Sequence, residues 1–263
     1  MILGASKRGL RLPMDLRSQS SSLGHGPKGA TLEIHEVRKR VHYLLAHARG
    51  VNGIVEHSAL LEIACELHNY HPFLSGYAED EARACIRETI RIMRYLSAQG
   101  IAEAIPFLLH ALESMGEALK YPTKGAAGLT QTEELVAVWR ELASIGASPV
   151  AQSNLANSLN TLAIRLLDSG RPEEALRVGA ESLEAWHHVD TGLPTEVRFQ
   201  RLVAIRNQLM RLVDLHHHEG LEDLRVEALR FSEELLTAKF ADPGMRDFTR
   251  QVRNEVRSMQ ASK

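Results

Sequence analysis

From Glu33 onward, apolar residues recur every three or four positions, and no run alternates apolar with polar residues as a half-buried strand would. This period predicts an all-α protein. Prolines and glycines interrupt the pattern at intervals, which marks where helices begin and end. We expect helices over residues 33–49, 54–70, 79–98, 102–120, 131–146, 151–169, 172–189, 195–218, 221–240 and 244–259.

Three places along this pattern need separate comment. Pro72 is expected between two helices, as a helix breaker. Pro106 falls several residues after the apolar pattern begins at Ile101, so that helix either begins later or has a distorted first turn. The connection over 121–130 contains Pro122, Gly125, Gly128 and Thr130, and we expect it to be the longest loop and a point where the body could divide.

The helical pattern contains internal repeats. Three stretches each place one arginine among large apolar residues and are followed by a glycine: Met93–Leu96 before Gly100, Ile164–Leu167 before Gly170, and Met210–Val213 before Gly220. Trp139 and Trp186 also sit in similar surroundings, which suggests equivalent second helices of two units. Recurring helix pairs that cannot bury their own apolar faces favour a stacked array.

The segment from Asn154 to Val189 is the best-formed unit, and it resembles a tetratricopeptide repeat. Its first helix carries large residues around Ala163, Gly170 follows at the turn, and small residues at Ala175 and Ser182 would let a second helix pack closely. The wording of this unit is closest to repeats of kinesin light chains and of signalling regulators. The resemblance implies a right-handed α-solenoid of about five antiparallel helix pairs. An unrelated helical bundle is the alternative.

In repeats of this kind the first helices line an extended concave surface that binds peptides or partner domains. Asn154, Asn157 and Asn160 step along one face of the first helix, and their amides both donate and accept hydrogen bonds. Arg165 and Arg211 are the repeated charged positions beside them. We expect these five residues to bind the partner. Alternatively, Asn154 caps the helix, the other two asparagines are merely solvated, and the arginines, like Arg94, pair across neighbouring helices.

The composition and charge of the chain limit the class of partner that it is expected to bind. The whole chain has a formal charge of −2, but residues 1–31 carry five basic residues against one acidic, a net of +4, which leaves −6 on residues 32–263. We therefore expect a disordered basic tail at 1–31, or alternatively an organelle transit peptide, followed by an acidic repeat domain with a capping helix at 244–259. Residues 9–13 of the tail could dock in the groove of another protein. No nucleic-acid partner or stable membrane association is expected.

Candidate catalytic and metal sites are few. Cys65, His68 and His71 share a three-residue spacing, but a structural zinc site would need further ligands from elsewhere. His216, His217 and His218 are expected within a helix, where consecutive side chains diverge too far to share one metal. Glu184 and His187 have the Glu-x-x-His spacing of di-iron sites, but such a site uses this motif twice together with two further glutamates, and here the motif occurs once. No phosphate loop, nucleophile elbow or dinucleotide fingerprint is present, so no cofactor and no metal are predicted.

Together these observations predict a non-catalytic scaffold or adaptor, cytoplasmic, that binds a peptide or a partner domain in a concave groove. A second hypothesis is a self-assembling, homodimeric regulatory subunit that docks on a catalytic partner. A small helical enzyme is the third, and it would require a deep pocket in which titratable groups converge.

Overall fold

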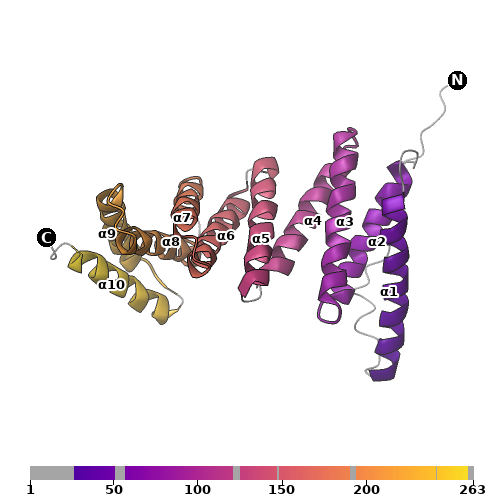
Figure 1. Cartoon of the computed structure of the whole chain (residues 1–263), viewed down its shortest axis with the longest axis horizontal. Helices are drawn as coiled ribbons and strands as arrows, with labels where there is room; N and C mark the ends of the chain where they lie inside the picture. The colour runs from indigo at the N-terminus through magenta and orange to yellow at the C-terminus, as the bar shows by residue number, and fades with distance from the viewer. Residues whose placement is uncertain are drawn as a thin grey trace. The chain divides into compact units, whose positions relative to one another are not determined.

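A computed structural model describes residues 27–50, 57–120, 125–146, 148–189, 194–240 and 242–259. Within these ranges all regular structure is helical, which confirms the all-α prediction. The helices are α1 (Pro27–Gly50), α2 (His57–Leu74), α3 (Glu79–Ala98), α4 (Ala104–Leu119), α5 (Gly125–Gly146), α6 (Pro149–Asp168), α7 (Pro172–His187), α8 (Thr195–Asp214), α9 (Leu221–Thr237) and α10 (Pro243–Ser258) (Figure 1).

The chain divides into two compact units, which we call unit 1 (Met1–Leu108) and unit 2 (Leu109–Lys263), and the division falls within α4. In unit 1, α2 and α3 form a tightly packed helical hairpin. Its contact is close because Ala64 is small and fully buried, and the Thr89 hydroxyl donates to the Ala64 carbonyl oxygen at 3.2 Å. α1 packs against this hairpin through Val41 and Leu44.

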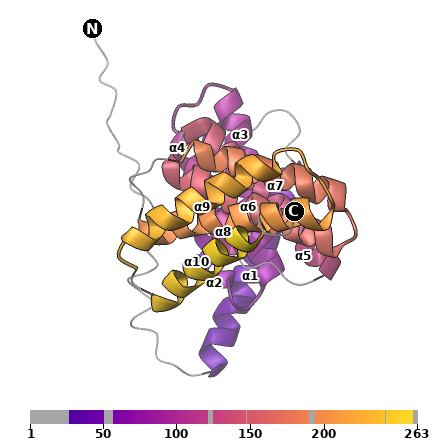
Figure 2. The same cartoon turned by 90° about the vertical axis from the view of Figure 1, so that its left-hand side faces the viewer.

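In unit 2, α6 and α7 form a second hairpin of the same kind. The Ser182 hydroxyl donates to the carbonyl oxygen of the buried Ala156 at 2.8 Å, a contact that repeats the one between Thr89 and Ala64. The small side chain predicted at Ser182 thus permits a close helix crossing. α8, α9 and α10 pack together beyond this hairpin around a core that includes Leu209 and Phe231 (Figures 1 and 2).

The helices that contain the three arginine stretches are predicted to end at residues 98, 169 and 218, and the first two ends are confirmed to within one residue. Gly100 and Gly170 have φ angles of +79° and +76°, and the residue after each donates its N–H to the carbonyl five residues back, as in a Schellman cap. The third prediction is wrong. α8 ends at Asp214, and His216, with φ +52°, takes the left-handed position, while Gly220 precedes α9. The three histidines 216–218 therefore do not lie in a helix.

Several predicted boundaries differ from the structure. Pro72 lies inside α2 near its C-terminal end, so it does not separate two helices. α4 begins later than predicted, at Ala104, which places Pro106 in its first turn, where a missing N–H costs little. α5 begins at Gly125, so the second half of the predicted loop 121–130 is helical.

The predicted disordered tail at 1–31 is described only in part. α1 begins at Pro27, so residues 27–31 are helical, and residues 1–26 lie outside the described residues. The predicted C-terminal helix is confirmed as α10, whose first turn is capped by the Asp242 carboxylate accepting from the Gly244 N–H at 2.8 Å. In the described part of the chain, no helix combines the length and the apolar character that crossing a membrane requires.

Candidate functional site

Two of the five predicted binding residues belong to a buried polar network between α6 and α8. Asn160 and Arg211 are almost fully buried. The Asn160 Oδ1 accepts from Asn207 Nδ2 at 3.2 Å and from Arg211 Nη2 at 3.5 Å, and Arg211 Nη1 also donates to Gln208 Oε1 at 3.1 Å. The arginine therefore pairs across neighbouring helices, which is the alternative that the sequence left open for it.

The cation of Arg211 is held by neutral amide oxygens. Within the described residues, no carboxylate forms a salt bridge with it. Burial lowers the pKa of the Arg211 guanidinium from 12.5 to about 10 because the charged form loses its hydration. The guanidinium is still protonated at neutral pH, so unit 2 contains a buried charge that only dipoles stabilise.

The other three predicted residues are partly exposed. Asn154 and Asn157 lie inside α6, which begins at Pro149, so Asn154 does not cap the helix. Their backbone carbonyl oxygens accept from the hydroxyls of Ser158 and Thr161. Arg165 is half-buried near the end of α6. The structure thus brings Asn160 and Arg211 together, whereas Asn154 and Asn157 are partly exposed on α6 and Arg165 lies near its end.

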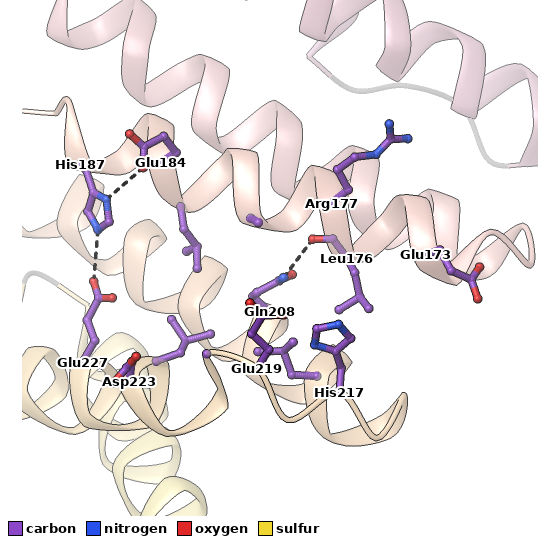
Figure 3. Close-up of a pocket in the computed structure, with 15 residues that line it drawn as sticks. Glu173, Leu176, Arg177, Glu184, His187, Gln208, His217, Glu219, Asp223 and Glu227 are labelled. Carbon is purple, nitrogen blue, oxygen red and sulfur yellow. Dashed lines mark hydrogen bonds and ion pairs between the residues drawn. The ribbon is translucent and has the colours of Figure 1, made fainter.

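A groove of about 670 Å³ lies elsewhere in unit 2, between α7 and α9. One wall is a single face of α7, because its lining residues recur every three or four positions from Glu173 to His187. The opposite wall is the first two turns of α9. The end of α8 and the turn that follows it complete the groove, with Gln208 Nε2 donating to the Leu176 carbonyl oxygen of α7 at 2.9 Å (Figure 3).

The groove has an apolar floor and an acidic rim. Its apolar lining consists of Leu176, Ala180, Leu183, Leu212 and Leu224. Five carboxylates, one guanidinium and two imidazoles line it: the acids are Glu173, Glu184, Glu219, Asp223 and Glu227, the guanidinium is that of Arg177, and the imidazoles are those of His187 and His217. Such a surface favours ligands that combine apolar and cationic groups.

His187 joins the two walls at one end of the groove. Its Nδ1 lies 3.5 Å from Glu184 on its own helix, and its Nε2 lies 3.9 Å from Glu227 on α9 (Figure 3). Glu227 also accepts from Arg201 at 2.7 Å. These contacts fix this end of the groove and neutralise part of its charge.

The remaining acids are not neutralised in this way. Among the described residues, Glu173, Glu219 and Asp223 have no ion-pair partner, although many other carboxylates in the same residues are paired with arginine. Carboxylates without an ion-pair partner among the described residues, placed around an apolar depression, give the groove a local negative potential.

The cysteines and histidines that share a metal-like spacing in the sequence do not form a site in the described residues. In the described residues, no three His, Cys, Asp or Glu side chains converge as metal ligands would. Burial raises the pKa of the Cys85 thiol to about 12, and burial also raises the pKa of Cys65, so neither is a thiolate at neutral pH. The structure therefore assigns neither cysteine a nucleophilic role.

Sequence reasoning missed the groove because it assigned binding to first helices. A signal was present in α7, where Glu173, Arg177, Glu184 and His187 share one face with Leu176, Ala180 and Leu183. That pattern looks like an ordinary solvated face with apolar gaps. Only the position of α9 opposite it turns the face into one wall of a depression.

Comparison with known proteins does not assign a family. No protein-family model matches the sequence, and no curated protein is significantly similar to it. Among solved structures, the chain is similar to a chain of the DHF119 filament, with 18% identity over 86% of this chain and 96% of that one and a TM-score of 0.22. It is also similar to a chain of the DHF58 filament, with 17% identity over 89% of this chain and 96% of that one and a TM-score of 0.19. Scores this low do not indicate a shared arrangement of helices.

Proposed function

We propose that this chain is a non-catalytic recognition protein whose groove between α7 and α9 binds a peptide segment carrying apolar side chains together with Lys or Arg. The observation that carries the proposal is the ring of carboxylates above an apolar floor, in which Glu173, Glu219 and Asp223 have no ion-pair partner within the described residues. Aliphatic side chains of the ligand would cover the floor, and its cations would meet the rim.

Physical reasons favour binding of moderate affinity with a strong salt dependence. Each aliphatic side chain that becomes buried contributes about 1.5–3 kcal/mol, before the cost of ordering the peptide. The rim charges are solvent-exposed, so they add less to affinity than to the rate of encounter, and salt screens them. The walls are helices held by α8 and the α6 hairpin, so the receptor loses little conformational entropy.

We further propose that the helix pairs form a right-handed array of the tetratricopeptide type. The α6–α7 hairpin supports this, since it has the small contact residues and the turn glycine that the resemblance requires. The partner surface in our proposal is nevertheless the second-helix face of α7, and not the first-helix residues Asn154, Asn157, Asn160, Arg165 and Arg211. Asn160 and Arg211 are engaged in a buried network, which makes them poor contact residues.

The first experiment reverses charge on the rim. A fluorescent peptide of alternating leucine and arginine is titrated with the chain, and binding is followed by anisotropy. Glu219→Lys with Asp223→Lys should weaken binding by about tenfold or more, because two attractive charges become repulsive. The matched control is Asp168→Lys with Asp214→Lys, which changes the net charge equally at two exposed carboxylates outside the groove and should leave binding unchanged. Equal losses in both variants would contradict the proposal.

The second experiment tests the apolar floor. Ala180 is exposed in the middle of the α7 wall, so Ala180→Glu should preserve the fold while it obstructs the floor. This change adds negative charge, so a purely electrostatic interaction would strengthen. Our proposal requires that binding of the leucine–arginine peptide weakens, with thermal melting confirming that the variant remains folded.

A further inference from the structure

Residues 10–16 of this chain have the chemistry that the groove requires. Every second position is apolar, so an extended backbone places four side chains on one face: Leu10, Leu12, Met14 and Leu16. Pro13 suits an extended backbone and opposes a helix. Residues 7–17 also contain one carboxylate, that of Asp15, and four basic side chains: Lys7, Arg8, Arg11 and Arg17.

We infer that residues 10–16 of one copy of this chain dock in the groove between α7 and α9 of a second copy. The inference rests on the function proposed above and names its ligand. The chain would then carry both the receptor groove and the segment that fills it, and would self-associate through them.

The dimensions of the two partners agree. Six residue steps of extended chain, from Leu10 to Leu16, span about 20 Å at about 3.3 Å per residue. The α7 wall from Glu173 to His187 comprises fourteen helical steps, or about 21 Å at about 1.5 Å per residue. Along that wall, Leu176, Ala180 and Leu183 are separated by rises of about 6 and 4.5 Å. Alternate side chains of an extended peptide are about 6.6 Å apart, so successive leucines can follow the floor.

The charges also agree. The groove lining carries five carboxylates against one guanidinium, and residues 7–17 carry four basic groups against one acidic. When the apolar face of the segment lies on the floor, Arg11 and Arg17 lie on the opposite face, from which their long side chains can reach either rim. Glu173 at one end and Asp223 on the facing wall are the acids that lack an ion-pair partner within the described residues.

Docking between copies depends only on the local geometry of the groove and on the sequence of the segment. It requires no particular arrangement of unit 1 and unit 2 within one chain, which is why we assign the contact to a second copy.

The test uses two full-length variants that are each defective in one partner surface. The tail variant, Leu12→Asp with Met14→Asp, retains the groove, and the groove variant, Glu219→Lys with Asp223→Lys, retains the segment. Sedimentation velocity should show association of the unchanged chain that increases with concentration and weakens in high salt. Each variant alone should be monomeric, and an equimolar mixture should form a heterodimer, because one intact groove meets one intact segment.

Two results would overturn the inference: a monomeric unchanged chain at every concentration, or association that persists in either variant alone. The leucine–arginine peptide separates this failure from failure of the proposed function. If that peptide binds the tail variant and Ala180→Glu abolishes its binding, the groove is a peptide site even when the mixture does not associate. A peptide of residues 7–17 with Leu12 and Met14 replaced by Asp serves as the matched control, and we expect at least a tenfold loss of its affinity for the tail variant relative to the unchanged peptide.

Discussion

Unit 1 and unit 2 handle charge in different ways. In unit 1, the buried Glu88 is matched by Arg91, whose Nη2 lies 2.6 Å from the carboxylate. Bidentate arginine pairs join helices in both units, such as Arg40 with Glu66 between α1 and α2 and Arg206 with Glu255 between α8 and α10. In unit 2, the buried Arg211 is held only by amide oxygens among the described residues, and several carboxylates around the α7–α9 groove have no ion-pair partner there.

The comparison separates charges that maintain structure from charges that remain available. A carboxylate paired with arginine has little potential left for a ligand, whereas the groove acids without an ion-pair partner among the described residues keep theirs. Both units contain the same kind of hairpin, with Thr89 on Ala64 in one and Ser182 on Ala156 in the other. The difference is therefore not one of fold class, and it lies in how a buried charge is compensated.

The largest effect is expected where the buried carboxylate of unit 1 loses its arginine partner. Arg91→Ala leaves the Glu88 carboxylate, 6% exposed, without its guanidinium and should lower the free energy of unfolding by about 3 kcal/mol. Chemical denaturation measures it. Glu88→Gln added to Arg91→Ala should restore most of the loss, because a neutral amide needs no counter-charge. A loss that Glu88→Gln fails to restore would mean that Arg91 acts through its contact with Ala48 alone.

The close crossing of α7 and α8 supports the Arg211 network, and Gly179→Ala should disrupt it. Alanine is the better helix former by about 1 kcal/mol, so propensity alone predicts a gain. A Cβ at this position would instead overlap Gln208 and Arg211, and overpacking should lower the free energy of unfolding by about 2 kcal/mol. Gln208→Ala in the same chain should relieve the overlap and recover part of the loss. Stabilisation by Gly179→Ala would contradict the crossing.

Removing the buried cation of unit 2 should have an effect opposite to that of Arg91→Ala. Arg211→Met deletes a charge that no carboxylate within the described residues compensates, so the free energy of unfolding should stay unchanged or rise by about 1 kcal/mol. Thermal and chemical denaturation both measure it. A loss as large as that of Arg91→Ala would show that the two units do not differ as proposed.

Acidification should weaken unit 1 through His71. Burial lowers the pKa of this imidazole below its ordinary value of 6.5, and Glu79 opposes the shift in part. Because the folded pKa is depressed, the contribution of neutral His71 is fully present above pH 6.5 and is lost as the pH falls through the folded value. His71→Phe should therefore flatten the dependence of the unfolding free energy between pH 7 and 5, and unchanged slopes would exclude His71 as the cause.

The smallest effect is expected at the end of α8. His216 occupies the left-handed position that glycine occupies at Gly100 and Gly170, and a residue with a Cβ is strained there. His216→Gly should raise the free energy of unfolding by about 0.5–1 kcal/mol. His218→Gly is the matched control, because His218 is an exposed neighbour without a positive φ, and it should bring no gain.

The sequence predicted most helices because local chemistry decides them. Pro149, Pro172 and Pro243 begin helices α6, α7 and α10 as expected, since a proline at the first position loses no hydrogen bond. Pro72 misled the prediction because packing of α2 on α3 holds the helix through the proline near its C-terminal end. Likewise, the periodicity predicts that α8 continues to residue 218, although it ends at Asp214 and the left-handed His216 follows.

The shared arginine pattern shows where sequence similarity stops being informative. Arg94 is exposed, Arg165 is half-buried and Arg211 is buried, although all three stand among similar apolar neighbours. The environment of each arginine depends on which helix crosses it, and for Arg211 that crossing is made possible by Gly179 of α7. Spacing along one helix does not contain this information.

By itself, the sequence determined that the chain is all-α, where most helices begin and end, and that the segment before Glu33 has a net positive charge, because these properties follow from periodicity, caps and composition over short distances. Only the tertiary structure decided which polar residues are buried together and which acids face one another. Asn160 meets Arg211 across α6 and α8, and Glu184 faces Glu227 across α7 and α9, through contacts between residues forty or more positions apart. The packing of whole helices sets such contacts, and it created the groove that no single helix shows.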